Sequence, residues 1–529
     1  MDNSLPIFKP WAPNWLINVT LFVLIMPNLV LFFLPMTNLN AAAGYYGSEP
    51  ADMQFAVALF YAGYVGFYSL ERRFFSFLAA KEYFIIFTFL QLAATFICYE
   101  TNEVFILFPL RFLQGMLFAC NVNISLSLMF SRIATERARE IGFSVFFGLL
   151  LCALPFNNLV TADLIDTFNY NIVYKIAVFS YVPGLLLLLT LMNNVRLNVK
   201  FPLYQLDWQS FVLYSIILSL IGYICIFGQE YYWLEDIRIL GSVVAIFGLG
   251  IVYAFRQKSL KRPYISLAVF KFRNFSVGLI VLFVMYICRF ASGITNTFFT
   301  QAYGFDPMHI SYINLFNLFG LIIGVTIACA MILQKRRIRS IWIPGFLLLL
   351  AFHFSMYFLF DIQGDEFNYF IPLFIQGLGV GLIMVPTIVY TISSVTLALG
   401  PSAAAICLAI RYLGFCVSIA LINFFTLFGK SSHYNAFQDH LTSTDPMSRL
   451  FLQKQVANLT HKGMTHGKAV KAAYKTLVNK VNTQGQLRFA MDYYEMMAWL
   501  IIATILFIAL TPYLNRTMLY LKSRRLSPA

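Results

Sequence analysis

Three arginines of this 529-residue chain lie inside long apolar segments, at Arg111, Arg289 and Arg411. An arginine side chain keeps its proton at any accessible pH, and at the centre of a bilayer it costs about 3 kcal/mol on insertion scales. No Asp or Glu lies near the middle of the apolar segments to neutralise these charges. Fixed cations of this kind line hydrated paths or bind anionic groups. A fourth cation, Lys175, lies near the end of its segment, from where its side chain can reach the interface.

Polar side chains share a helical face with two of these arginines. Helical spacing places three sets on single stripes: Arg111, Gln114, Asn121 and Ser125; Arg289, Ser292, Asn296 and Thr300; and, without a charge, Gln376, Thr387, Thr391 and Ser394. Polar faces at bilayer depth need water or protein opposite them. We therefore predict one hydrated cavity lined by helices from both halves of the chain, with Arg411 as a further cavity residue. The alternative is that each arginine, Arg411 above all, ties helices together through neighbouring carbonyl groups.

The composition places these stripes in a membrane. The chain is 60% hydrophobic and 11% charged, whereas soluble domains are about 25% charged. All eight cysteines fall inside apolar runs without metal-ligand spacing, so we expect neither a metal site nor a cofactor. The first apolar segment is long enough to span a bilayer and follows no cleavable pattern, which predicts an uncleaved first helix.

Segments of about 20 mostly apolar residues predict membrane-spanning helices. Fourteen qualify, at residues 14–36, 52–70, 83–99, 104–130, 141–160, 172–192, 208–227, 239–255, 275–297, 308–333, 341–360, 370–398, 402–427 and 494–514. Lys and Arg concentrate in the even-numbered connections, which predicts that both termini are cytoplasmic. This loop bias accounts for the net charge of +14, so the charge does not indicate nucleic-acid binding.

One predicted external connection is long and spans residues 429–492. Asp445 before Pro446 predicts a helix cap, and Val470, Ala473, Leu477 and Val481 form a helical stripe. We predict a small external helical hairpin. It is either a solvated helix pair or a surface that docks a partner.

Short motifs along the chain resemble a known family. Residues 111–115, Arg-Phe-Leu-Gln-Gly, resemble the RxxQG motif on the fourth helix of the major facilitator superfamily. The fourteen spans resemble its drug/proton antiporter branch of EmrB/QacA type. GLGVG at residues 377–381 and RYLG at residues 411–414 agree. The resemblance covers nearly the whole chain.

The resemblance implies an all-α polytopic membrane protein of the major facilitator fold. Its six-helix bundles would occupy residues 14–192 and 275–514, with two inserted helices at residues 207–256, and it would work by alternating access around a midplane site. The small-xxx-small spacing of Gly377 and Gly381 predicts close helix packing, and the resemblance adds Gly115 and, in the antiporter motif, Pro155. It assigns a conformational lock to Glu71 and Arg72. In EmrB-like members it also implies a periplasmic adaptor and an outer-membrane channel as partners.

The chain departs from the family pattern at the positions that the family links to proton transport. Met26 stands where the first helix usually carries an Asp, and the antiporter motif is reduced to residues 154–158. A proton-driven cycle needs a group that changes protonation, which arginine cannot do. The candidates lie at the predicted external helix ends, with Asp52 first, then Asp492 and Glu495. Their alternative interpretation is as solvated helix-end acids.

These features lead to the hypothesis of an inner-membrane secondary transporter that exports amphipathic small molecules, some of them anionic, by means of the proton gradient. Its partners would be the small molecule, protons and the lipid bilayer. Within transport, the alternative is a dedicated carrier of one endogenous organic acid or siderophore-like metabolite. A polytopic enzyme on lipid-linked substrates is the alternative of another class. It would need paired carboxylates, or a nucleophile with a base, at the membrane face, and the sequence offers neither, so we expect no enzyme.

Overall fold

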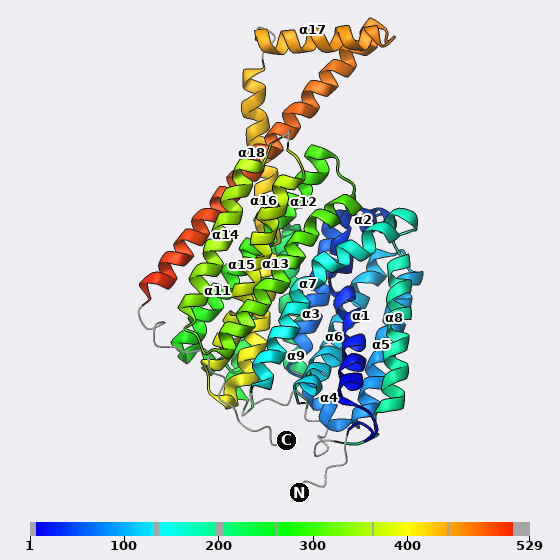
Figure 1. Ribbon diagram of the computed structural model, residues 1–529, viewed down its shortest axis with the longest axis vertical. Helices are drawn as coiled ribbons and strands as arrows, with labels where there is room; N and C mark the ends of the chain where they lie inside the picture. The colour runs from blue at the N-terminus through cyan, green and yellow to red at the C-terminus, as the bar shows by residue number, and fades with distance from the viewer. Residues whose placement is uncertain are drawn as a thin grey trace.

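The computed structural model describes residues 7–131, 137–196, 206–260, 262–361, 364–441 and 445–511. Every regular element in this part of the chain is helical, and most helices run along the body of the molecule (Figure 1). The first half holds α1 (Asn14–Thr37), α2 (Leu39–Tyr46), α3 (Pro50–Phe67), α4 (Glu71–Phe77), α5 (Ala80–Glu100), α6 (Val104–Ser131), α7 (Ala138–Thr167) and α8 (Ile172–Leu191). Then come α9 (Trp208–Phe227) and α10 (Ile237–Ser259). The second half holds α11 (Arg273–Phe290), α12 (Ser292–Phe298), α13 (Pro307–Leu333), α14 (Arg339–Leu359), α15 (Phe367–Ser393), α16 (Gly400–His440), α17 (Pro446–His461) and α18 (His466–Leu510).

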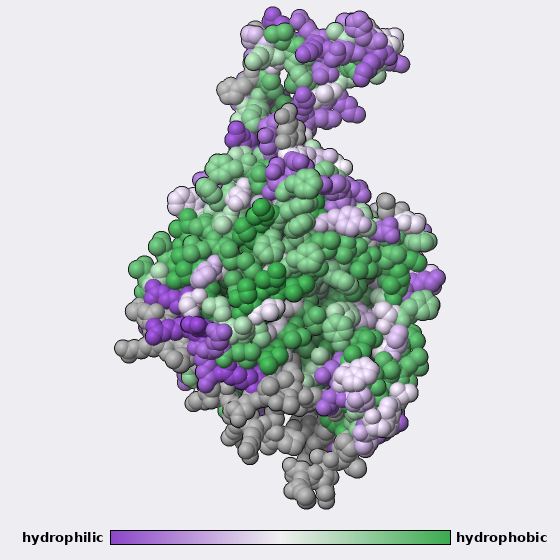
Figure 2. Space-filling model, in the orientation of Figure 1, coloured by the Kyte–Doolittle hydropathy of each residue, from purple (hydrophilic) through white to green (hydrophobic). Residues whose placement is uncertain are grey.

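Thirteen spans in the described part of the chain are long and apolar enough to cross a membrane. The predicted span outside this group corresponds to α3, an 18-residue helix that is mostly buried and packs against α6 and α9. Figure 2 shows a broad apolar surface across the face of the body in view, with hydrophilic side chains gathered on the projecting helices at the top and again at the lower edge. The prediction of an all-α, multi-pass membrane protein is confirmed.

The two halves meet along α3, α7 and α16. Helix α7 packs against α13 and α15, while α16 packs against α3 and α9. Helix α10 packs on α9 and leaves most of its own surface exposed, as expected of an inserted helix. The bundle bounds at residues 14–192, 207–256 and 275–514 stay predictions.

The ninth predicted span is interrupted. Helix α11 ends at Phe290, α12 begins at Ser292, and Phe299–Tyr303 forms a π-helical turn. Ala291, at the break, keeps right-handed helical dihedral angles, whereas π-helical turns such as the one that follows are frequent at functional sites. The segment after α11 is therefore a candidate part of a functional site in the second half of the chain.

The described part of residues 429–492, which we call the arm, contains α17 and the start of α18, which pack against each other. Asp445 caps α17 as predicted, since its carboxylate accepts a 2.8 Å hydrogen bond from the Ser448 backbone N–H. The predicted spans 402–427 and 494–514, however, belong to much longer helices, because α16 continues to His440 and α18 already begins at His466. Neither α16 beyond its first turn nor α18 contains a proline, so neither helix is stopped where its apolar run ends.

Glycines lie where helix backbones touch. A Cβ atom on Gly377 of α15 would clash with the Asn317 carbonyl oxygen of α13, and one on Gly381 would lie 2.8 Å from that of Leu321. A Cβ atom on Gly115 of α6 would clash with the Phe60 carbonyl oxygen of α3. These glycines thus allow close approach within each half.

Gly377→Ala should lower the free energy of unfolding by about 1–3 kcal/mol, because the added methyl group forces α13 and α15 apart. Thermal unfolding in detergent measures the loss. The control is Gly248→Ala in α10, where a Cβ atom would meet no other atom within 4 Å. Equal melting temperatures for the two variants would contradict the role given to this crossing.

Candidate functional site

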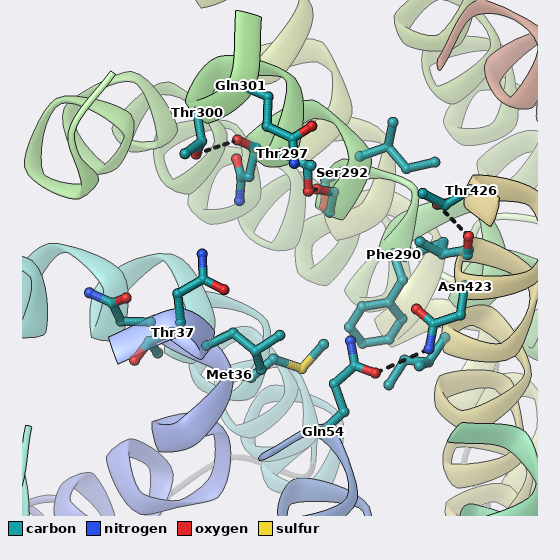
Figure 3. A pocket seen from close by; sticks show the side chains of 18 of the residues that line it. Met36, Thr37, Gln54, Phe290, Ser292, Thr297, Thr300, Gln301, Asn423 and Thr426 are labelled. Carbon is teal, nitrogen blue, oxygen red and sulfur yellow. Dashed lines mark hydrogen bonds between the residues drawn. The ribbon is translucent and has the colours of Figure 1, made fainter. Parts of the chain in front are cut away.

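A cavity of about 840 Å³ lies between the two halves, at the end of the body that faces the arm (Figure 3). Helices α1, α2, α3 and α7 line it from the first half, and α12, α13, α16 and α18 from the second. The cavity therefore lies where alternating movement of two halves would open and close it.

Most side chains around this cavity are uncharged polar or apolar, beside the charged Glu49, Glu230 and Lys430. Amides and hydroxyls come from both halves, with apolar surface between them: Thr37, Gln54, Asn158, Ser292, Thr297 and Asn423 beside Met36, Leu154, Phe290, Ile422 and Phe489. Sites for drug-sized ligands have this size and this mixture. The lining suits a molecule with an apolar body and a few polar groups.

One hydrogen bond joins the halves at the cavity wall. The Asn423 side chain of α16 donates to the Gln54 amide oxygen of α3 at 3.3 Å, as Figure 3 shows. It is long for such a bond, and it must break if the halves separate here.

The sequence-predicted cavity residues divide into two groups. Ser292 and Asn296 line the cavity. The Asn296 side-chain oxygen accepts a 3.2 Å hydrogen bond from Asn314 of α13. The other seven predicted residues, Arg111, Gln114, Asn121, Arg289, Gln376, Thr387 and Arg411, are all buried and do not line it in this conformation.

The expectation that Arg111 faces water is corrected by its contacts. The side chain is fully buried, donates to the Leu31 and Phe32 carbonyl oxygens of α1 at 2.9 and 3.1 Å, and lies over the Phe60 ring. In a helix the Leu31 carbonyl would accept from residue 35, but Pro35 has no N–H. Arg111 therefore supplies the donor that the proline removes, which is the carbonyl-tying alternative.

Arg289 also bonds to a carbonyl oxygen that a proline leaves without its intrahelical donor. Its guanidinium donates to the Leu151 carbonyl oxygen at 3.2 Å, and the residue four positions after Leu151 is Pro155, inside α7. The bond crosses from α11 in the second half to α7 in the first. Pro155 thus acts by freeing an acceptor as well as by shaping its helix.

The remaining buried polar residues bond to their neighbours. Gln114 accepts from Arg111 at 2.9 Å, and Asn121 accepts from Thr88 at 3.5 Å. Gln376 accepts from Asn317 at 3.0 Å, and Thr387 accepts from the Trp342 indole at 2.8 Å. These stripes face protein rather than an open space, and the roles assigned to them in binding stay predictions.

The predicted lock is described only in part. Glu71 is buried and accepts a 2.7 Å hydrogen bond from the Asn123 amide of α6. The side chain of Arg72 lies outside the described part of the structure, so its pairing with Glu71 stays a prediction.

The three acids proposed for proton coupling make helix-end and surface contacts. Asp52 accepts from the Glu49 backbone N–H at 3.1 Å, Asp492 pairs with His433 at 2.6 Å, and Glu495 accepts from Trp499 at 3.4 Å. None of them lines the cavity.

Two other acids do line the cavity, Glu49 before α3 and Glu230 after α9. A hydrogen bond with Glu49, partial burial, and the charges of Glu49 and Asp52 raise the pKa of Glu230 to about 7, against a smaller opposing effect of Arg238. Sequence reasoning missed Glu230 because the two acids lie far apart in the chain. A search for acids in all external connections, rather than at helix ends alone, would have found it.

No family model matches the chain. It is 22% identical over 289 residues to the colistin resistance protein EmrB of Acinetobacter baumannii, a match that spans 53% of this chain and only 54% of that relative's length.

Solved transporters have the same overall structure. The human organic anion transporter MFSD10 (TETRAN) superimposes with a TM-score of 0.54 at 9% identity, covering 94% of this chain and all of that one. A POT-family transporter in complex with 5-aminolevulinic acid gives 0.58 at 12% identity, covering 97% and 99%. The fold that the sequence resemblance implies is thereby confirmed: the chain has the major facilitator fold.

Proposed function

We propose that the chain is an inner-membrane transporter that exports amphipathic small molecules by alternating access, with both termini cytoplasmic. The observation that carries this proposal is the cavity between the halves, whose volume and mixed lining fit such molecules. The EmrB relative, named for colistin resistance, supports export of a toxic compound. A periplasmic adaptor and an outer-membrane channel belong to the proposal as partners.

Reconstitution tests the proposal directly. Purified protein in proteoliposomes with an imposed pH gradient is expected to move amphipathic dyes across the membrane, and to stop when the gradient is collapsed. Movement across a broad panel supports export of many compounds. Movement of one organic acid alone favours the dedicated carrier. No movement of any compound, with the protein shown to be folded, would falsify the proposal.

We further propose that Glu49 and Glu230 share the coupling proton. Both line the cavity, and their carboxyl groups lie close enough to interact, so proton loss places two negative charges near each other. The charge of Asp52, the first candidate from the sequence, acts on the same pair.

The pH dependence follows from the raised pKa of Glu230. An ordinary Glu has a pKa of about 4.3. The contribution of the Glu230 proton to the stability of the folded protein is therefore fully present below that pH, and it is lost as the pH rises through about 7. Glu49→Gln removes the neighbouring charge and should move the midpoint of the pH–transport profile down by about one unit or more. Asp492→Asn, at the exposed His433 pair, is the control and should leave the midpoint in place. An unchanged midpoint in Glu49→Gln excludes the pair as the coupling group.

A further inference from the structure

Two arginines lie in the interior between the halves, just below the cavity. Arg289 of α11 and Arg411 of α16 are at least nine-tenths buried and are close enough to repel each other. Neither forms an ion pair with any described residue, and no described Asp or Glu bonds to them. A buried charge without a counter-charge is costly, and proteins normally pair such charges.

Most donors of these two groups are unused by the protein. A guanidinium carries five N–H donors. In the described residues Arg289 donates to the Leu151 carbonyl at 3.2 Å, and Arg411 donates to the Tyr286 hydroxyl at 2.8 Å. Ring faces provide the remaining contacts, with Phe290 5.6 Å from Arg289 and Phe147 5.1 Å from Arg411.

A hydroxyl from the first half faces the same place. Tyr61 of α3 is buried beside Arg411 and Tyr286. Its hydroxyl group finds no hydrogen-bond partner at normal distance. Two cations and a hydroxyl group thus converge from α3, α11 and α16.

Arg289 lies about one helical turn below the cavity, and Arg411 lies about two turns before Ile419, the first residue of α16 that lines it. Leu151 bonds to Arg289, and Leu154, three residues further along α7, lines the cavity. Phe290, next to Arg289, stands in the cavity wall in Figure 3 and packs edge-on against Phe415 of α16 at 5.4 Å. Phe290 therefore belongs both to the cavity wall and to the surroundings of Arg289, whose guanidinium lies 5.6 Å from its ring.

We propose that Arg289, Arg411 and the Tyr61 hydroxyl form a binding site for one monovalent anionic group that enters from the cavity past Phe290. The group is either the carboxylate of an amphipathic organic anion, whose apolar body stays in the cavity, or a free inorganic anion. If the group is the carboxylate of the organic anion, the site takes part in substrate recognition, and this role rests on the proposed function. Anion binding itself does not depend on transport.

Three probes with one ring system test the site: 2-naphthoate, the neutral 2-naphthamide and the cationic 2-naphthylmethylamine. Calorimetry on the detergent-purified full chain should show that 2-naphthoate binds about tenfold or more tightly than the amide, as charge-assisted hydrogen bonds require. Arg289→Gln with Arg411→Gln should remove this preference and leave amide binding unchanged. Arg411→Lys, which keeps the charge, should retain part of it. Lys175→Gln is the control for loss of a cation elsewhere in the membrane region.

Chloride distinguishes the two sources. Titration that displaces 2-naphthoate supports one shared anion site, and chloride binding without any 2-naphthoate binding assigns the site to an inorganic anion. Equal affinity of the wild type for all three naphthalene probes, with no chloride binding, overturns the proposal, and this result needs no variant to fold. Transport of the cationic probe by the double variant would show that the proposed function holds even where the anion site fails.

Discussion

Gly293→Phe should lower the transport rate at least about tenfold while leaving the protein folded. Gly293 lies in the first turn of α12 and lines the cavity. A Cβ atom there would meet no other atom within 4 Å, so a side chain enters open space instead of displacing packed neighbours. The phenyl ring takes up room that the substrate needs and covers the Ser292 and Asn296 side. Because sites of this kind bury most of their ligand, a ring placed inside the cavity removes ligand contacts on one whole wall.

The dye-transport assay in proteoliposomes measures this effect, and melting temperature checks the fold. Gly248→Phe is the matched control, since Gly248 also offers open space around its Cβ position but lies on the exposed helix α10. The control should transport at the wild-type rate. Normal transport by folded Gly293→Phe would show that substrates do not pass through this cavity.

Arg111→Met should lower the free energy of unfolding by about 3–5 kcal/mol. The change leaves the Leu31 and Phe32 carbonyls of α1 without the donors they now use, and each buried acceptor that loses its partner costs about 1–3 kcal/mol. Gln114 loses a partner as well. Methionine keeps much of the apolar volume, so the loss reports on hydrogen bonding more than on packing.

A double-mutant cycle isolates the cause. In a Pro35→Ala background, residue 35 regains an N–H that can pair with the Leu31 carbonyl within α1. The cost of Arg111→Met should then fall by about 1 kcal/mol or more. Unfolding in mixed detergent micelles gives both differences. A cost that is the same in both backgrounds contradicts the assignment of Arg111 to the proline-freed carbonyl.

The sequence predicts most of the fold because apolar length is a direct signal. The span predicted at residues 208–227 coincides with α9, and the cap at Asp445 is found as expected. The ends of α16 and α18 could not be predicted by the same rule. A hydropathy pattern records where lipid ends, whereas a helix ends only where the backbone is stopped.

The site is less predictable because it depends on which helices meet. Ser292 and Asn296 share a stripe with Arg289, and the stripe does reach the cavity at those two positions. The stripe of Arg111 faces α1, where its partner is the Leu31 carbonyl oxygen. The only sign of this partner in the sequence is Pro35, four residues after Leu31. Local spacing identifies a polar face but does not show whether water or a carbonyl lies opposite. Glu49 and Glu230 join through tertiary contact alone.

The continuity of α16 and α18 gives the arm a mechanical role. Both helices run without interruption between the cavity wall, which Asn423 and Phe489 line, and the end of the arm that carries α17 (Figure 1). Such helices act as stiff levers, so a tilt of the second half against the first swings the arm through a wide arc. If the proposed alternating access holds, a label on α17 would report, from outside the membrane, whether the cavity is open or closed.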